Sequence, residues 1–139
     1  MYLTLTDIVL LTSIIQSLAL AVFLLLPSNS GLISNRLLVA TLVFFAAGLG
    51  EIFLYGSGLA LQHPNFAYLG TLIGLLQAGS LYLYAQSLMY QNFQLRGKHL
   101  VHTLLFWVVG AIFLIEYYLQ PSETKVQILL ERDHPGVLT

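Results

Sequence analysis

The sequence predicts an all-α integral membrane protein with four antiparallel transmembrane helices and a short amphipathic C-terminal helix. Of its 139 residues, 58% are hydrophobic and only 8% are charged, and the mean hydropathy is +0.83. A water-soluble domain carries about 25% charged residues, so a soluble helical bundle is excluded by the lack of a charged surface. Crossing a bilayer core takes about 20 apolar residues, a length reached by four stretches, at 8–26, 37–61, 66–90 and 100–119.

The first stretch, 8–26, contains no charged residue. The preceding segment, Met1–Asp7, has no Lys or Arg, so it lacks the basic region that opens a signal peptide. We therefore expect this stretch to be retained as a helix. The run Pro27-Ser28-Asn29-Ser30-Gly31 is a cluster of helix-breaking residues that should end it.

The second and third stretches are separated by only a short link, His63-Pro64-Asn65. Pro64 disfavours helical geometry at the residue before it, which places the break at His63. Two helices joined by so short a link must lie side by side and antiparallel.

The fourth stretch, 100–119, is followed by Gln120-Pro121-Ser122. A short amphipathic helix is expected over 122–132, with Val126, Leu129 and Leu130 on its apolar face. No repeat or low-complexity tract interrupts the chain, so 1–139 is interpreted as a single membrane domain.

Basic residues in short loops remain in the cytoplasm, and this rule predicts the orientation. Arg36 lies between the first two stretches, and Arg96 and Lys98 lie between the last two. Both links are therefore predicted inside, and the N-terminus and C-terminus outside, although the tail also carries Lys125 and Arg132. The residues expected to meet anionic lipid at the membrane interface are Arg36, Arg96, Lys98, His99 and His102.

Small residues recur every four positions along 66–90, at Gly70, Gly74 and Ala78. Such a ridge lets another backbone approach closely, so this face is predicted to pack against the second or the fourth helix of the same chain. A second copy of the chain or the membrane helices of a partner are further possible contacts. The leucine side of the same helix is expected to face lipid, with Leu72, Leu76 and Leu83.

Polar residues inside the apolar stretches suggest a polar core or a small-ligand pocket. The candidates are Glu51, Gln16, Gln77, Ser80 and Tyr84. A charge within a transmembrane helix costs at least about 2.5 kcal/mol, so two hypotheses for Glu51 are kept. It is either protonated and hydrogen-bonded to Gln16 or Gln77, or it relays protons or holds a cation.

The sequence offers no catalytic or metal-binding constellation, and neither an enzyme nor a cofactor is predicted. The chain has no cysteine, which excludes thiolate metal sites. His99 and His102 have a possible ligand spacing, but no Asp or Glu lies near them in the sequence.

The run Leu81-Tyr82-Leu83-Tyr84-Ala85-Gln86-Ser87-Leu88, followed by Phe93-Gln94-Leu95-Arg96, Lys98 and His102, resembles bacterial membrane-bound AraC-type transcription regulators. The similar part is their N-terminal multi-helix membrane region, and it covers roughly 37–119. Two positions depart from that pattern. Ala78-Gly79 stands where the family tends to have Gly-Pro, and Leu105 stands where a proline is expected after the histidine.

This resemblance implies a membrane-embedded sensory, signal-input region in a bacterial cytoplasmic (inner) membrane. The C-terminal helix-turn-helix domain of such regulators has no counterpart in this sequence, so no direct nucleic-acid binding is expected. A partial protein is therefore expected. Two alternatives remain, a small transport or accessory subunit that uses Glu51, and a non-functional truncated fragment.

Overall fold

The structure, a computed structural model, describes residues 4–26, 31–90 and 92–133, and the regular secondary structure in this part of the chain consists of helices alone. It contains four helical segments long and apolar enough to cross a membrane, at Leu5–Leu25, Ile33–Gly56, Pro64–Met89 and Gly97–Tyr118. The predicted set of four apolar helices is thus confirmed in length and composition. The predicted break at Pro27-Ser28-Asn29-Ser30 lies outside the described residues.

Helix α1 (Leu5–Leu25) begins three residues earlier than predicted because Thr4 caps it. The Thr4 hydroxyl accepts a hydrogen bond from the Asp7 backbone N–H at 3.2 Å, and an Asp7 carboxylate oxygen accepts from the Thr4 N–H at 2.8 Å. This reciprocal pair satisfies N–H groups that the first turn of a helix leaves without partners.

The prediction that the second helix extends to residue 61 is wrong. Helix α2 (Ile33–Gly56) ends five residues earlier, at a Gly56-Ser57-Gly58 turn in which Gly58 has φ +74°. Glycine enters this left-handed region without steric cost. The single-turn helix α3 (Leu59–Gln62) and the 3₁₀ turn η1 (Pro64–Phe66) then lead to α4 (Leu69–Met89).

The fourth predicted stretch is helical but not uniform. It consists of the 3₁₀ helix η2 (Gly97–Thr103), the α-helix α5 (Leu104–Phe113) and one π-helical segment, η3 (Leu114–Tyr118). The predicted short helix is present as α6 (Ser122–Asp133). Its Leu129 is fully buried, whereas Leu130 is exposed, so the buried face of α6 is turned away from Leu130.

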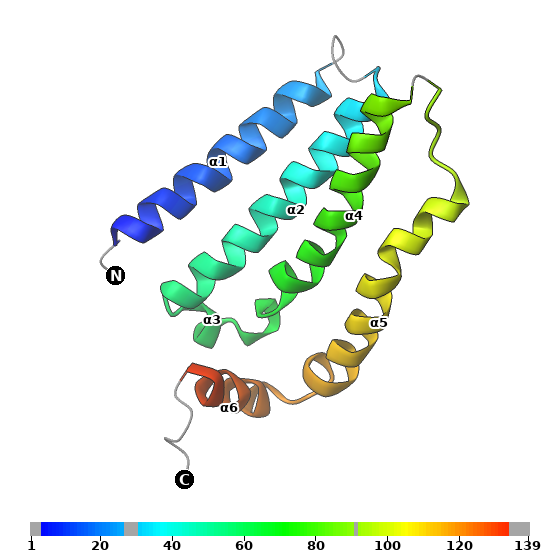
Figure 1. Cartoon of the computed structure of the whole chain (residues 1–139). Coiled ribbons are helices and arrows are strands. Elements are labelled where there is room, and N and C mark those ends of the chain that lie inside the picture. Colours follow the sequence, from blue (N-terminus) through cyan, green and yellow to red (C-terminus); the bar gives the residue numbers. More distant parts are fainter. Residues whose placement is uncertain (1–3, 27–30, 91, 134–139) are drawn as a thin grey trace.

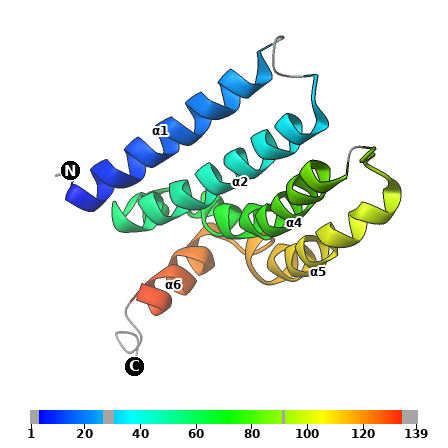
Figure 2. The same cartoon turned by 45° about the horizontal axis from the view of Figure 1, so that its top comes forward.

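In Figure 1 the chain ascends along α1, descends along α2, ascends along α4 and descends along α5. Helix α2 packs against α1 and α4, and α5 has far fewer contacts with α4. Figure 2 shows the same order of helices, with α6 lying across one end of the bundle.

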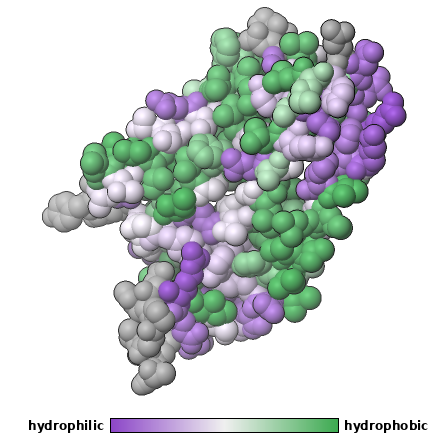
Figure 3. All heavy atoms as spheres, viewed as in Figure 1, coloured by the Kyte–Doolittle hydropathy of each residue, from purple (hydrophilic) through white to green (hydrophobic). Residues whose placement is uncertain are grey.

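The two ends of this bundle differ, and each is given a name here. The α6 end comprises the start of α1, the last turns of α2, the start of α4, and α6. The basic end is the opposite one and carries Arg36, Arg96 and Lys98. Figure 3 shows hydrophilic side chains over α6 and over the loop after α4, with hydrophobic side chains covering α5 between them.

Large apolar side chains on α1 and α5 are exposed, and Trp107 is 66% exposed. Helix α4 is different, because α2 packs on one side of it and α5 and η2 on another. Leu72 and Leu83 are therefore buried, and the predicted leucine face toward lipid is wrong. The exposed positions of α4 include Ala78, Leu81, Tyr82, Ala85 and Leu88.

Candidate functional site

The Glu51 carboxylate of α2 caps the first turn of α4. Tyr68, which precedes α4, provides no side-chain cap of its own. Instead its backbone N–H donates to Glu51 Oε1 at 3.1 Å, the Thr71 hydroxyl donates to the same oxygen at 3.0 Å, and the Thr71 N–H donates to Oε2. Glu51 is only 6% exposed. A carboxylate suits this position because helix N-termini carry unpaired N–H groups and a partial positive charge.

Gly70 permits this close approach of α2 and α4. A Cβ atom at this position would lie 2.5 Å from the Ala47 carbonyl oxygen and 2.6 Å from Glu51 Cβ. Both neighbours belong to α2, and moving them to make room would displace the Glu51 carboxylate from the start of α4. Gly74, one turn along, has no atom within 4 Å of its would-be Cβ, so the predicted ridge makes close contact with α2 at Gly70 and leaves space at Gly74.

An aromatic cluster lies below the cap at the α6 end. The Tyr68 ring lies 4.9 Å from the Tyr117 ring and 5.0 Å from the Phe113 ring, between centroids. The hydroxyls of Tyr117 and Tyr118 donate to the Pro64 and Ala67 carbonyl oxygens at 2.7 and 2.8 Å. Tyr68 has φ +65°, a geometry that costs a residue with a side chain about 1–3 kcal/mol, and the surrounding contacts hold it there.

Two basic side chains of α6 hold this helix against the aromatic cluster. The Lys125 ammonium donates to Asn65 Oδ1 at 2.8 Å, and Lys125 is only 6% exposed. The Arg132 guanidinium lies 4.4 Å from the centroid of the Tyr55 ring and 5.4 Å from that of Tyr68. An exposed arginine such as Arg132 gains about 0.5–1 kcal/mol from cation–π contacts.

A cavity of about 350 Å³ lies beside the cap, between α2 and α4. Small-molecule sites usually measure about 300–1,000 Å³, so this volume is at the lower end of that range. Glycines open it from both helices, and Arg132 of α6 completes the lining. The lining residues are Phe45, Gly48, Leu49, Glu51, Ile52, Tyr55, Gly70, Thr71, Gly74, Gln77 and Arg132.

Hydrogen-bond donors dominate the polar lining of this cavity. The Tyr55 hydroxyl oxygen is buried and has no hydrogen-bond partner among the residues that the structure describes. Gln77 contributes an amide and Arg132 a guanidinium, whereas the Glu51 oxygens already accept three hydrogen bonds. The Tyr55 hydroxyl can therefore donate to a small molecule that carries an acceptor or an anionic group, beside the positive charge of Arg132.

Of the five residues predicted as a polar core, two meet in this cavity, Glu51 and Gln77. Ser80 lies elsewhere, with its hydroxyl 2.9 Å from that of Thr41 in the buried α2–α4 contact. Gln16 is exposed on α1, and Tyr84 is half-buried outside the cavity. The hydrogen bonds of Glu51 run to Tyr68 and Thr71 in place of the Gln16 or Gln77 partner that the sequence suggested.

Three contributors escaped the sequence analysis. Tyr55 lies one helical turn after Glu51, and that spacing was available as a signal. The backbone N–H groups at the start of α4 have no signature in a sequence, because every residue except proline carries one. Arg132 reaches the cavity only because α6 folds back across the α6 end, which no local pattern indicates.

The residues predicted at the membrane interface lie at the basic end. Arg36 is in the first turn of α2, and Arg96, Lys98 and His99 open η2. His102 packs beside Tyr82 with a centroid separation of 4.7 Å. Its backbone lies close to Gly79, where a Cβ atom would be 3.1 Å from the His102 carbonyl oxygen. Gly79 is thus a second close approach that the sequence analysis missed.

Within the described ranges, no group of three or more His, Cys, Asp or Glu side chains is placed to hold a metal ion. Comparisons with models of protein families, with curated proteins and with solved structures found no match.

Proposed function

We propose that this chain is the membrane-embedded signal-input region of a bacterial sensor, with the α2–α4 cavity as the place where a small acid binds. The observation that carries the proposal is the donor-rich interior of the cavity. Tyr55, Gln77 and Arg132 face a common space next to the helix cap, and the Tyr55 hydroxyl has no partner among the described residues. A carboxylate on a small apolar body would accept a hydrogen bond from the Tyr55 hydroxyl, lie beside Gln77 and the Arg132 cation, and fill the volume.

The cavity also joins elements whose relative positions a ligand would alter. Its walls belong to α2 and α4, which pack extensively, and to α6, whose basic side chains contact the cluster. A ligand that draws the Arg132 guanidinium away from the Tyr55 ring would shift α6. A ligand that binds one conformation more tightly than the other shifts the population toward the conformation it prefers.

The proposed membrane arrangement has four antiparallel crossings in a cytoplasmic membrane, with the basic end inside the cell. All six acidic residues of the chain are remote from that end, in the first turn of α1, the late turns of α2, η3 and α6. Three of the five basic residues lie at that end, against Lys125 and Arg132 in α6, and an excess of basic residues favours retention of that end in the cytoplasm. The α6 end would then face outward, where it meets external solutes.

Two considerations favour sensing over transport. The sequence resembles the membrane regions of AraC-type regulators, which are signalling proteins. In addition, Glu51 is engaged with three donors at the start of α4, and a proton or cation carrier would have to break this cap in each cycle.

A distance measurement across the bundle tests this proposal. The chain has no cysteine, so spin labels attach only to introduced cysteines. Two suitable changes are Val43→Cys, at an exposed position of α2, and Gln127→Cys, at an exposed position of α6. We expect a panel of straight-chain carboxylic acids, from butyrate to decanoate, to change the pulsed-EPR distance in proteoliposomes saturably and to raise the melting temperature. Tyr55→Phe and Arg132→Gln should weaken both effects, whereas Ala78→Ser, at an exposed position of α4 outside the cavity, should not.

Three results would count against the proposal. Unchanged distances and melting temperatures for every acid would remove the binding site. Equal responses in Tyr55→Phe would separate any binding from this cavity. Acid-dependent ion flux that disappears in Glu51→Gln would replace sensing with transport.

A further inference from the structure

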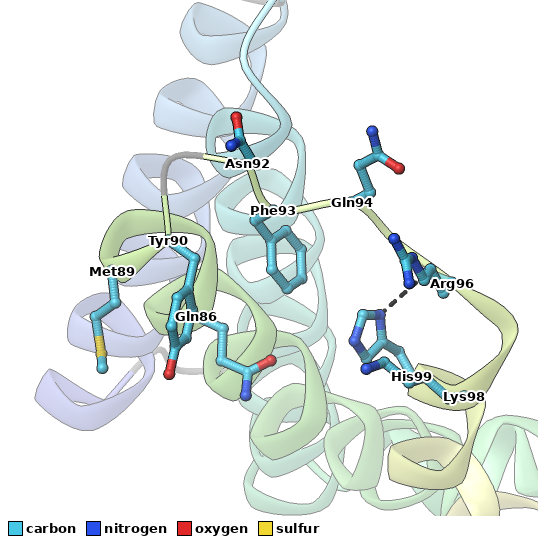
Figure 4. Close-up of a pocket in the computed structure, with 9 residues that line it drawn as sticks. All are labelled: Gln86, Met89, Tyr90, Asn92, Phe93, Gln94, Arg96, Lys98 and His99. Carbon is cyan, nitrogen blue, oxygen red and sulfur yellow. Dashed lines mark hydrogen bonds between the residues drawn. The ribbon is translucent and has the colours of Figure 1, made fainter.

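A second, larger cavity opens at the basic end of the bundle, on the opposite side of the molecule from the α2–α4 cavity. It measures about 680 Å³ and lies between the end of α4 and the segment that enters η2. Figure 4 shows Arg96, Lys98 and His99 along one side of it and the α4 residues Gln86 and Met89 along the other. Tyr90, Asn92, Phe93 and Gln94 complete the lining.

The lining of this cavity carries positive charge and no acidic side chain. Arg96 and Lys98 are cations, and the lining contains no Asp or Glu. The six acidic residues of the chain belong to α1, the late turns of α2, η3 and α6. Because no carboxylate lines the cavity among the described residues, the field there attracts anions.

His99 is held in one orientation as a hydrogen-bond donor. The backbone N–H of Arg96 donates to His99 Nδ1 at 3.1 Å. A neutral imidazole whose Nδ1 accepts carries its proton on Nε2. The ring is also stacked on Phe93, with centroids 5.3 Å apart and planes inclined by 17°. The Nε2–H donor is therefore fixed by packing and by the backbone before any ligand arrives.

We infer that this cavity binds a phosphate group, and that the phosphate belongs to the headgroup of an anionic membrane lipid. Arg96 would form a two-pronged contact with the phosphate oxygens, a geometry for which guanidinium is suited. Lys98 would add an ammonium and His99 its Nε2–H. Met89 and Tyr90 also line the cavity, and their side chains would contact the glycerol portion of the lipid.

The surroundings of the cavity favour a lipid over a soluble phosphate compound. Leu100, Val101 and Leu104 follow the basic residues directly, and each is at least 60% exposed. A headgroup seated among the basic residues would leave its acyl chains against this apolar surface. The ligand would also connect the end of α4 to η2, two elements joined by a loop in which the described residues 92–96 form no helix.

The inference goes beyond the proposed signal-input function, and each can fail separately because the two cavities share no lining residue. Its test measures binding of phosphatidylglycerol, and of phosphatidylcholine as the uncharged comparison, to the purified full chain in detergent micelles. Arg96→Gln is expected to lower the affinity for phosphatidylglycerol about tenfold, since a charged hydrogen bond contributes about 1.5 kcal/mol. His99→Phe, which retains an aromatic ring over Phe93 but lacks the donor, should lower it to a smaller extent.

Arg36→Gln is the matched control, because it removes one positive charge at the same end without altering the cavity lining. The inference predicts less than about a twofold change for it, in line with the small effect of an exposed charge. Equal losses for Arg36→Gln and Arg96→Gln would mean diffuse surface attraction and would overturn the inference. So would equal affinities for phosphatidylglycerol and phosphatidylcholine.

Competition with inorganic phosphate and glycerol 3-phosphate identifies the source of the phosphate group. No displacement of phosphatidylglycerol by either compound is expected, because neither carries acyl chains to use the apolar surface. Displacement at millimolar concentration would overturn the lipid assignment in favour of a soluble phosphate compound. Melting curves of all variants without lipid separate loss of binding from loss of fold.

Discussion

The α6 end and the basic end of this bundle are built in opposite ways. At the α6 end, polar groups are paired within the protein, through the Glu51 cap, the tyrosine hydroxyls and the Lys125–Asn65 contact. At the basic end, Arg96 and Lys98 are exposed beside a wide cavity. The comparison indicates that one end of an apolar bundle is closed by internal contacts, while the other remains available to a charged ligand.

The largest expected difference between the ends comes from adding one methyl group. Gly70→Ala at the α6 end would drive a Cβ atom against Ala47 and Glu51, whereas Gly97→Ala at the basic end would meet nothing within 4 Å. Overpacking costs about 1–3 kcal/mol, and we expect Gly70→Ala to lie near 3 kcal/mol because the cap is displaced too. Unfolding in detergent measures both variants, and similar losses would contradict the contrast.

Glu51→Gln should have the next largest effect. The amide retains one acceptor oxygen but places an NH₂ group against a donor at the start of α4, where both carboxylate oxygens now accept. Hydrogen bonds to charged groups contribute about 1.5–3 kcal/mol, so a loss of about 2 kcal/mol is expected. Unfolding in the same detergent measures the loss, and a change of less than about 0.5 kcal/mol would contradict the capping role of Glu51.

The matching change at the basic end is His99→Gln, which removes a stacked ring and one acceptor. We expect it to lower the free energy of unfolding by less than about 1 kcal/mol, a typical value for one uncharged hydrogen bond. The same detergent unfolding assay compares it with Glu51→Gln. A loss at His99 equal to that at Glu51 would show that the basic end is held as firmly as the α6 end.

The smallest effect is expected for the two arginines. Arg132→Gln removes the cation from the Tyr55 and Tyr68 rings and should cost about 0.5–1 kcal/mol. Arg96→Gln should leave the stability of the lipid-free protein unchanged within about 0.5 kcal/mol, as for most exposed positions. Thermal melting in a zwitterionic detergent distinguishes them, and reversal of the order would contradict the account of α6.

Much of the fold was predictable from the sequence, because runs of apolar residues are long and unambiguous. The four apolar helices and the short helix after Pro121 were all found. The boundary errors arose where local geometry departs from the apolar pattern, at the Gly56-Ser57-Gly58 turn and at left-handed Tyr68. The prediction that Leu72 faces lipid failed because lipid and the protein interior favour the same apolar side chains.

The candidate site was only partly predictable. Glu51 and Gln77 stood out as polar residues in apolar helices, and they do line one cavity. The capping role of Glu51 depends on where the start of α4 lies in space, and the contribution of Arg132 depends on how α6 folds back. Both are tertiary facts, which single-residue polarity does not encode.

Backbone hydrogen exchange in proteoliposomes tests the contrast between the two ends most directly. The account predicts slow exchange at the amides of Tyr68 and Thr71, which Glu51 holds, and faster exchange across 92–99. Glu51→Gln should speed exchange at the start of α4 alone, and phosphatidylglycerol should slow it at the basic end alone. Equal exchange at both ends of the wild-type protein, or an equal response of both ends to Glu51→Gln, would contradict the account.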